Sequence, residues 1–157
     1  SSVKVVSPKP GDVVVYPGLV SGEIAGEEIL KLVEATLTDK KVRPLTDNVS
    51  VKAPIAKNYS IDIQYYIDSD NSYYADTIKS RVDAAVTDYI QWQSGKVGRD
   101  IIPSELIRRV MEAGAKRVSV TSPIFTVVKD GKKEEGYQVE LAQCTGKTIT
   151  YGGVEHE

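Results

Sequence analysis

Residues 59–67 read YSIDIQYYI, and every second side chain from the third position onward is large and apolar: Ile61, Ile63, Tyr65 and Ile67. The positions between them carry more polar groups: Asp62, Gln64 and Tyr66. A period of two is typical of a β-strand that is buried on one face. Because the apolar face of a sheet has to be covered by another layer, this strand predicts a layered fold.

A long helix is expected directly after this strand. Apolar residues recur at helical spacing through residues 72–93, and they include Ile78, Val82, Val86 and Tyr89. At about 1.5 Å per residue, a helix of that length would extend on the order of 33 Å. We expect Asp70, Asn71 or Ser72 to cap its N-terminus.

The same residues imitate the start of a calcium loop, since 68–72 reads DSDNS. A calcium loop of this kind needs glycine at its sixth position and glutamate at its twelfth. Tyr73 and Lys79 occupy those positions. We therefore interpret the stretch as a helix cap and not as a metal site.

The stretch 98–123 predicts a break, a second helix and a strand. Gly98 allows the chain to turn after the long helix, Pro103 suits the first turn of the next, and Gly114 suits its end. The expected apolar stripe of this helix consists of Leu106, Ile107, Val110 and Met111. Alternation in the segment that follows predicts a strand around Val118 and Val120.

The remaining segments complete an α+β fold. Strands at 3–6 and 12–16, a helix over about 26–38 and a short strand before residue 54 make a β-β-α-β unit. The expected apolar face of that helix consists of Ile29, Leu32, Val33 and Leu37.

Residues 55–157 make a β-α-α-β-β unit with a possible extra edge strand in KTITYGG. We expect strands at 124–128 and 137–142 to flank a charged turn at 129–136. The predicted domains are 1–54 and 55–157, each with helices on an antiparallel sheet, packed together as the C-terminal part of a longer chain.

Composition limits the function classes. The 157 residues are 41% hydrophobic and 27% charged, with a net charge of -2, so no global field favours nucleic acid. One cysteine, Cys144, and one histidine, His156, leave almost no soft ligands for a metal and no internal disulfide. We expect no catalytic, cofactor or metal site, and therefore no enzyme. The chain opens on Ser-Ser without methionine, which favours a fragment of a longer protein.

The segment 144–148, CTGKT, ends like a phosphate-binding loop. That loop requires a glycine five residues before the Gly-Lys pair, and Leu141 stands there. A helix should also follow, but the next residues read as strand and turn. We therefore expect a hairpin turn here.

Two rival functions remain open from the residues alone. Four tyrosines precede the long helix, and basic residues occur at 115–117, which is a combination that can bind single-stranded nucleic acid. Core packing accounts for Tyr65, and Glu134 and Glu135 neutralise the lysines of the charged turn. The alternative is thus a nucleic-acid-binding α+β module. A carboxylate-based hydrolase is the third candidate.

Three ordered stretches carry a family resemblance: VRPLTDNVSVKAP (42–54), YIQWQSGKVGRDIIPSELIRRVMEAGAKRVSVTSPIFT (89–126) and ITYGGVEHE (149–157). They closely resemble the C-terminal half of the baseplate J-like proteins of contractile-tailed phages and phage-derived tail particles. The charged turn and the CTGKT segment behind it are a departure from that pattern.

The resemblance implies a structural wedge component that joins neighbouring baseplate and tail proteins, and associates with itself in the assembled ring. It implies no catalytic residue, cofactor, nucleic acid or membrane partner. It also implies a location in the virion tail baseplate after synthesis in the bacterial cytoplasm. From the residues, Arg99 and Asp100 are left to pair locally or with a neighbour. We expect them at or near a subunit contact, and the alternative is a local ion pair in the loop.

Overall fold

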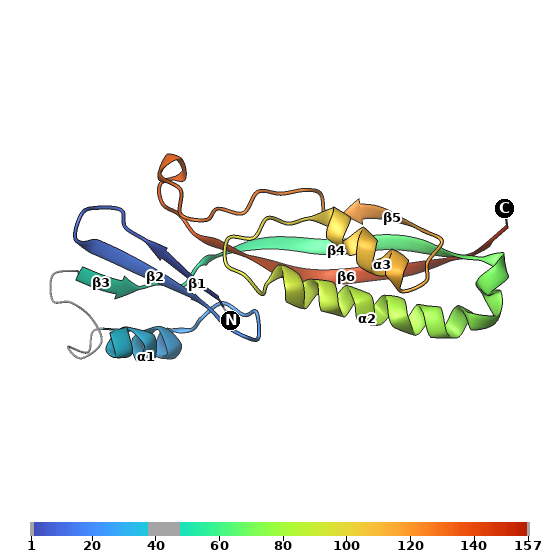
Figure 1. Ribbon diagram of the computed structural model, residues 1–157, viewed down its shortest axis with the longest axis horizontal. Helices are drawn as coiled ribbons and strands as arrows, with labels where there is room; N and C mark the ends of the chain where they lie inside the picture. The colour runs from blue at the N-terminus through green and yellow to red at the C-terminus, as the bar shows by residue number, and fades with distance from the viewer. Residues whose placement is uncertain (1, 38–47, 157) are drawn as a thin grey trace. The chain divides into compact units, whose positions relative to one another are not determined.

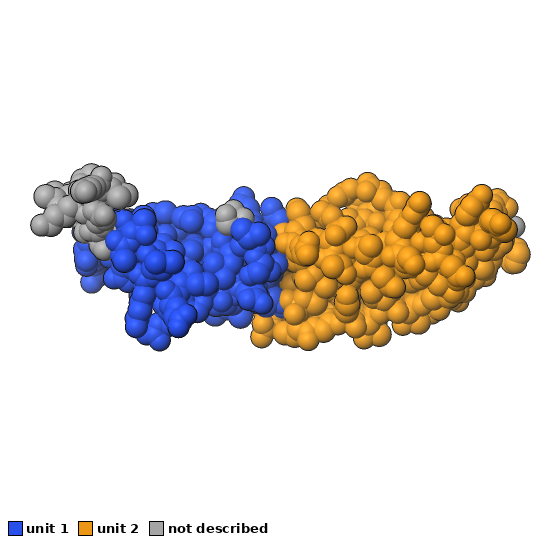
Figure 2. Space-filling model, turned by 90° about the horizontal axis from the view of Figure 1, so that it is seen from below, with its two compact units in different colours: residues 1–57, 94–100, 127–143 blue, residues 58–93, 101–126, 144–157 orange. Residues whose placement is uncertain are grey.

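The computed structural model describes residues 2–37 and 48–156. The chain folds into two compact units (Figure 2). Unit 1 contains 1–57, 94–100 and 127–143, and unit 2 contains 58–93, 101–126 and 144–157. The elements in chain order are β1 (Ser2–Val6), β2 (Asp12–Gly18), α1 (Glu27–Leu37), β3 (Asn48–Val51), β4 (Ile55–Asp68), η1 (Ser69–Tyr74), α2 (Ala75–Gln93), α3 (Pro103–Glu112), β5 (Arg117–Ser122), η2 (Lys133–Glu135) and β6 (Glu140–Glu155).

The predicted α+β class and both element orders are confirmed (Figure 1). Unit 1 begins with β1, β2, α1 and β3, and the longer part of the chain follows as β4, α2, α3, β5 and β6. The strands form two sheets, with orders β1-β2-β3 and β5-β4-β6. The division into domains at residue 54 stays a prediction.

The sheet of unit 1 is mixed, which corrects the expectation of antiparallel pairing. β1 pairs antiparallel with β2, where Val5 lies opposite Val15. β2 then pairs parallel with β3, where Val15 lies opposite Val51. The reason is α1, because a helix between two strands returns the chain to the edge of the sheet where the first strand began.

One face of this sheet packs on a small apolar cluster. Val6 of β1 joins Val97, Val139 and Leu141, which come from segments far apart in the sequence. On the helix, Val33 and Leu37 are half-buried, whereas Leu32 is 70% exposed. The predicted apolar face of α1 is therefore only partly covered.

The sheet of unit 2 follows the alternation that the sequence predicts. Ile61, Ile63 and Ile67 are at most 1% exposed, while their neighbours on the other face of β4 are open to solvent. Tyr59 of β4 meets Tyr89 of α2 edge to face, with ring centroids 6.4 Å apart. The helix α2 thus covers the apolar face of the sheet (Figure 1).

β4 and β6 run side by side in the same direction (Figure 1). The Thr145 hydroxyl donates to the Tyr59 carbonyl at 3.2 Å, and the Tyr151 ring lies 5.6 Å from that of Tyr65. Contacts in the same order along both strands require parallel strands. β5 pairs antiparallel with β4, so this sheet is mixed as well.

Three local expectations are wrong. Residues 144–148 form no hairpin turn, because pairing with β4 carries β6 through Gly146 without a break. Residues 124–128 form no strand beyond a single bridge between Ile101 and Thr126, since Pro123 before them cannot donate to a ladder. The expected capping residues, 70–72, lie inside η1, which precedes α2. The N-cap of η1 is Asp68, whose carboxylate accepts from the Asp70 N–H at 2.9 Å.

The helix α3 begins and ends where the sequence predicts. Pro103 is its first residue, and Gly114 follows its end with a φ of 118°. Leu106 and Val110 are fully buried, but Ile107 and Met111 are 38% and 40% exposed. Of the four residues in the predicted apolar stripe, Leu106 and Val110 are therefore buried, whereas Ile107 and Met111 are not.

Candidate interaction surface

The segment that carries Arg99 and Asp100 lies tightly against residues 128–130 in unit 1. The Gly98 N–H donates to the Glu140 carbonyl at 2.9 Å, and the Val128 N–H donates to the Asp100 carboxylate at 2.9 Å. Gly98 has a φ of 78°, and a Cβ added there would lie 2.6 Å from the Cβ of Asp130. Asp100 thus holds a neighbouring loop in place.

Arg99 lines a hollow of about 310 Å³ within unit 1. Among the described residues, the other charged ones around it are Lys4, Lys96 and Asp130. Three cationic side chains against one carboxylate favour an anionic group in this hollow. Sequence reasoning missed Lys4 and Lys96, because nothing local indicates that they share a hollow with Arg99.

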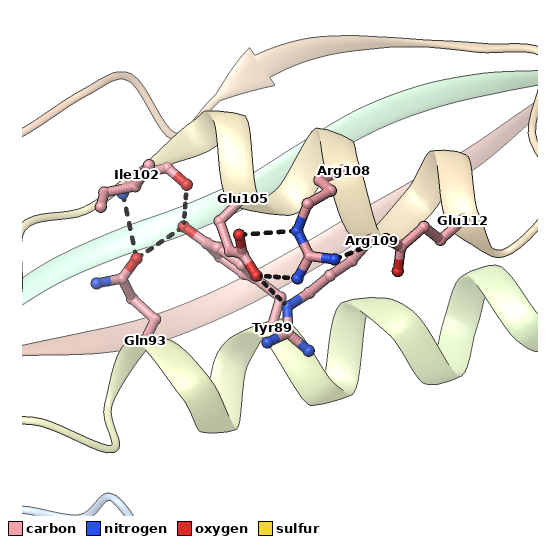
Figure 3. A network of polar contacts seen from close by, with 7 residues as sticks. All are labelled: Tyr89, Gln93, Ile102, Glu105, Arg108, Arg109 and Glu112. Atoms are coloured by element: carbon pink, nitrogen blue, oxygen red, sulfur yellow. Dashed lines mark hydrogen bonds and ion pairs between the residues drawn. The ribbon is translucent and has the colours of Figure 1, made fainter.

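α3 carries a partly buried network of ion pairs (Figure 3). Glu105 accepts hydrogen bonds from Arg108 and Arg109, and Arg108 also donates to Glu112 at 2.7 Å. The hydrogen bonds from Arg108 and Arg109 lower the pKa of Glu105 from its ordinary value of 4.5. The i, i+3 and i, i+4 spacing of these residues is the signal that could have predicted the network.

A buried polar group joins α2 to the start of α3 (Figure 3). Gln93 is fully buried, and its side-chain oxygen accepts from the Tyr89 hydroxyl at 3.0 Å and from the Ile102 N–H at 3.2 Å. Burial raises the pKa of Tyr89. The phenol therefore stays protonated and donates its hydrogen bond throughout the physiological range.

The open face of the sheet in unit 2 carries a second charged group. The Arg117 guanidinium lies 3.7 Å from the centroid of the Tyr66 ring and forms two hydrogen bonds to Glu155, at 2.6 and 3.1 Å. These bonds lower the pKa of Glu155. A Cβ added to Gly152 would lie 2.4 Å from the Tyr66 ring. Glycine is needed here because the aromatic ring covers the strand.

The four tyrosines of the nucleic-acid hypothesis do not share one surface. Tyr65 is 2% exposed in the core, and Tyr66 stacks under Arg117 on the opposite face of β4. Tyr73 and Tyr74 are 90% and 57% exposed on η1. The structure therefore does not bring the four rings and the basic residues into a single groove.

Within residues 2–37 and 48–156, no three His, Cys, Asp or Glu side chains lie close enough together to hold a metal ion. No helix there has the length and apolar character needed to cross a membrane. The features that remain on the described surface are charged hollows, ion-pair networks and exposed apolar side chains.

The hydrogen bonds of Asp100 and Gln93 and the ion pairs of α3 fix the shape of the units to which they belong. Comparison with protein families identifies the class of protein. The profile of the baseplate J-like central domain matches residues 1–53, and that of the baseplate J-like protein C-terminal domain matches residues 61–132. The chain belongs to the baseplate J-like family.

A named relative is baseplate protein J of Escherichia phage P2. It is 25% identical to this chain over 156 residues, which cover 98% of this chain and 48% of the relative. The chain therefore spans about half the length of that protein.

Proposed function

We propose that this chain is a structural wedge component of the baseplate of a contractile phage tail or a phage-derived tail particle, and that it acts by protein–protein assembly. The observation that carries the proposal is the pair of family matches, central domain followed by C-terminal domain, in chain order. The proposed partners are other baseplate wedge and tail proteins and further copies of the chain. The proposed location is the virion tail baseplate, after synthesis in the host cytoplasm.

The proposal includes the absence of an enzymatic role. It is supported by the membership of a structural family and by the kind of polar groups present. Glu105 is held by two arginines, and Glu155 is held by a third. Carboxylates fixed in ion pairs stabilise a surface but are poorly placed to exchange protons with a substrate.

The family matches support a boundary between residues 53 and 61, although the segments 94–100 and 127–143 of the second predicted domain pack with 1–57 in unit 1. One match ends at residue 53 and the next begins at residue 61, on either side of the predicted boundary at 54. Limited proteolysis of the purified chain tests it. Cleavage between 53 and 61 with two resistant products would support domains 1–54 and 55–157, whereas cleavage elsewhere first would contradict that division.

Within this function, we place Arg99 and Asp100 at or near a subunit contact. The support is the cationic hollow that Arg99 lines, which suits a carboxylate from a partner. Asp100 contributes indirectly, because its bond to the Val128 N–H fixes the segment next to Arg99.

Charge reversal tests this placement. We expect Arg99→Glu combined with Asp100→Lys to reduce tail assembly, whereas Lys9→Glu, at an exposed position of unit 1, should not. Asp100→Asn keeps an oxygen for the Val128 N–H and separates the effect of charge from that of loop structure. Normal assembly by the double variant would remove Arg99 and Asp100 from the contact.

The function itself is tested by co-purification of the full-length protein with the tail proteins encoded beside it. We expect a stable complex with at least one of them. If the folded full-length protein associates with none, the proposed function is wrong.

A further inference from the structure

The strand β1 lies at an open edge of the sheet in unit 1. In the strand order β1-β2-β3, β1 has a neighbouring strand on one side only. Its side chains Val3 and Val5 are 63% and 56% exposed. An edge strand presents backbone N–H and C=O groups that can pair with a further strand. β1 can therefore accept another strand on its outer side.

The register of the sheet shows which backbone groups of β1 face this open edge. The Lys52 N–H donates to the Val15 carbonyl at 2.9 Å, so the backbone groups of Val15 point toward β3. Val5 lies opposite Val15 in the antiparallel pair of β1 and β2, and opposite residues exchange either both hydrogen bonds or none. Val5, and Val3 two residues before it, therefore point their N–H and C=O groups away from β2. Among the described residues, none forms a hydrogen bond with these four groups.

The charged hollow that Arg99 lines runs beside the same edge. It is lined by three consecutive residues of β1, 2–4, and consecutive side chains of a strand alternate between the two faces of the sheet. Lys4 and Lys96 contribute two ammonium groups to the hollow. Neither forms an ion pair with Asp130, which also lines the hollow, or with any other described residue. A carboxylate placed between the two lysines would be attracted by both.

The two faces of β1 differ in chemistry, and this difference defines the segment that fits. Val3 and Val5 share one face, whereas Ser2 and Lys4 share the other. A strand that pairs with β1 matches it when apolar side chains lie beside the valines and a carboxylate lies beside Lys4. A second copy of β1 does not match, because antiparallel pairing over the full length of the strand would place two Lys4 side chains opposite each other.

We infer that β1 is extended by one strand from another baseplate or tail protein. The added segment alternates β-branched apolar residues with carboxylates, and one carboxylate lies in the hollow between Lys4 and Lys96. The inference rests on the proposed function, since it names the chemistry of the partner segment. In this kind of recognition the main-chain hydrogen bonds supply affinity and the alternate side chains supply specificity.

Hydrogen exchange of single backbone amides tests the added strand. The full-length protein is compared free in solution and in assembled tails, by mass spectrometry with fragmentation that resolves neighbouring amides. We expect the Val3 and Val5 amides to exchange about tenfold or more slowly in the tails. The Lys4 amide points toward β2 and is the internal control, because it should be protected in both samples.

Two results of this experiment would overturn the inference. Rapid exchange of Val3 and Val5 in assembled tails would mean that no strand is added. Protection in the free full-length protein would mean that another part of the same polypeptide covers the edge. Both results leave the proposed function intact, whereas normal tails that lack the protein altogether would overturn the proposed function.

Carbodiimide coupling in assembled tails tests the identity of the partner. The reagent activates a carboxylate, and a lysine amine in contact with it then displaces the activating group to form an amide bond. We expect Lys4 or Lys96 to be joined to an Asp or Glu of a different tail protein, and Lys9, at an exposed position of the same unit, gives the background. Coupling to a second copy of this chain, or coupling no stronger than that of Lys9, would contradict the inferred partner.

A substitution at Val5 separates the backbone from the side chain. Val5→Pro removes an N–H that bonds no described residue, and an edge strand tolerates proline at such a position, so the melting temperature should change little. The yield of assembled tails should nevertheless fall about tenfold or more. Val5→Thr keeps the N–H and the β-branched shape, and it should assemble nearly as well as the native protein. Equal yields from the two variants would contradict pairing through the backbone.

Discussion

The helices α1 and α2 differ in how much of their apolar surface their own unit covers. α1 has 11 residues and none of them is buried, whereas α2 has 19 residues, of which five are buried. Val3 and Val5 on the edge strand β1 are also 63% and 56% exposed. Unit 2 therefore stabilises its helices from within, while α1 contributes little core to unit 1.

This difference teaches that α1 and α2 depend on the packing of their own unit to different extents. Short helices gain most of their stability from tertiary packing, so a helix without buried residues opens at low free-energy cost. The sheet and α2 of unit 2 therefore hold each other in place, whereas we expect α1 of unit 1 to open first.

Leucine-to-alanine substitutions in the two units give the largest expected effect. Leu106 in α3 is fully buried, and Leu106→Ala should lower the free energy of unfolding by about 2–5 kcal/mol. Leu32 in α1 is 70% exposed, and Leu32→Ala should cost less than about 1 kcal/mol. Chemical denaturation of the purified chain measures both. Equal losses would break the comparison between the units.

The buried polar group of unit 2 comes next. Gln93→Leu removes the acceptor of the Ile102 N–H and of one Tyr89 hydrogen bond. An unsatisfied buried donor should cost about 1–3 kcal/mol. Thermal unfolding measures the change, and Ser80→Leu, on the exposed side of the same helix, is the control. A loss no larger than that of the control would mean that water replaces the amide.

Two glycines of β6 give a smaller and sharper contrast. Gly152→Ala places a Cβ 2.4 Å from the Tyr66 ring and should cost about 1–2 kcal/mol, because the ring must leave its place under Arg117. A Cβ on Gly146 meets nothing within 4 Å, so Gly146→Ala should change stability by less than about 0.5 kcal/mol. Denaturant midpoints of the two variants decide this prediction, and it is wrong if Gly146→Ala is the more damaging.

The pH dependence should be the smallest effect. The pKa of Glu105 is lowered by hydrogen bonds from Arg108 and Arg109. Its stabilising contribution is therefore present above the ordinary carboxylate pKa of 4.5 and is lost as the pH falls through the lowered value. We expect Glu105→Gln to lose less melting temperature than the native chain between about pH 7 and about pH 3. Parallel pH curves would contradict a role of this ion pair.

The parts of the fold that the sequence predicts are those with long uniform periods. The alternation of β4 and the helical spacing of α2 extend over enough residues to outweigh local exceptions. The continuity of β6 was missed because Gly146 and Gly152 read locally as breaks, although pairing with β4 supports the strand through both. The structure of such a segment depends on the strand with which it pairs, and this pairing cannot be recognised from the local sequence.

The candidate surfaces were less predictable than the fold. The placement of Arg99 and Asp100 at a subunit contact stays a prediction, and the hollow beside Arg99 includes Lys4, which is distant in the sequence. A recess in unit 1 that is lined by Val14 and Ile55 likewise combines segments that only the folded chain brings together. Sequence periodicity predicts which side chains of a single helix or strand are buried. A recess instead depends on which side chains of several elements stay exposed next to one another in the folded chain.

The central claim is that this chain is a structural part of a contractile-tail baseplate. Negative-stain microscopy tests it most directly, on particles from the source genome after deletion of the region that encodes these residues. We predict that sheathed tails with baseplates disappear and return when the region is supplied in trans. Normal tails with complete baseplates in the deletion strain would contradict the claim.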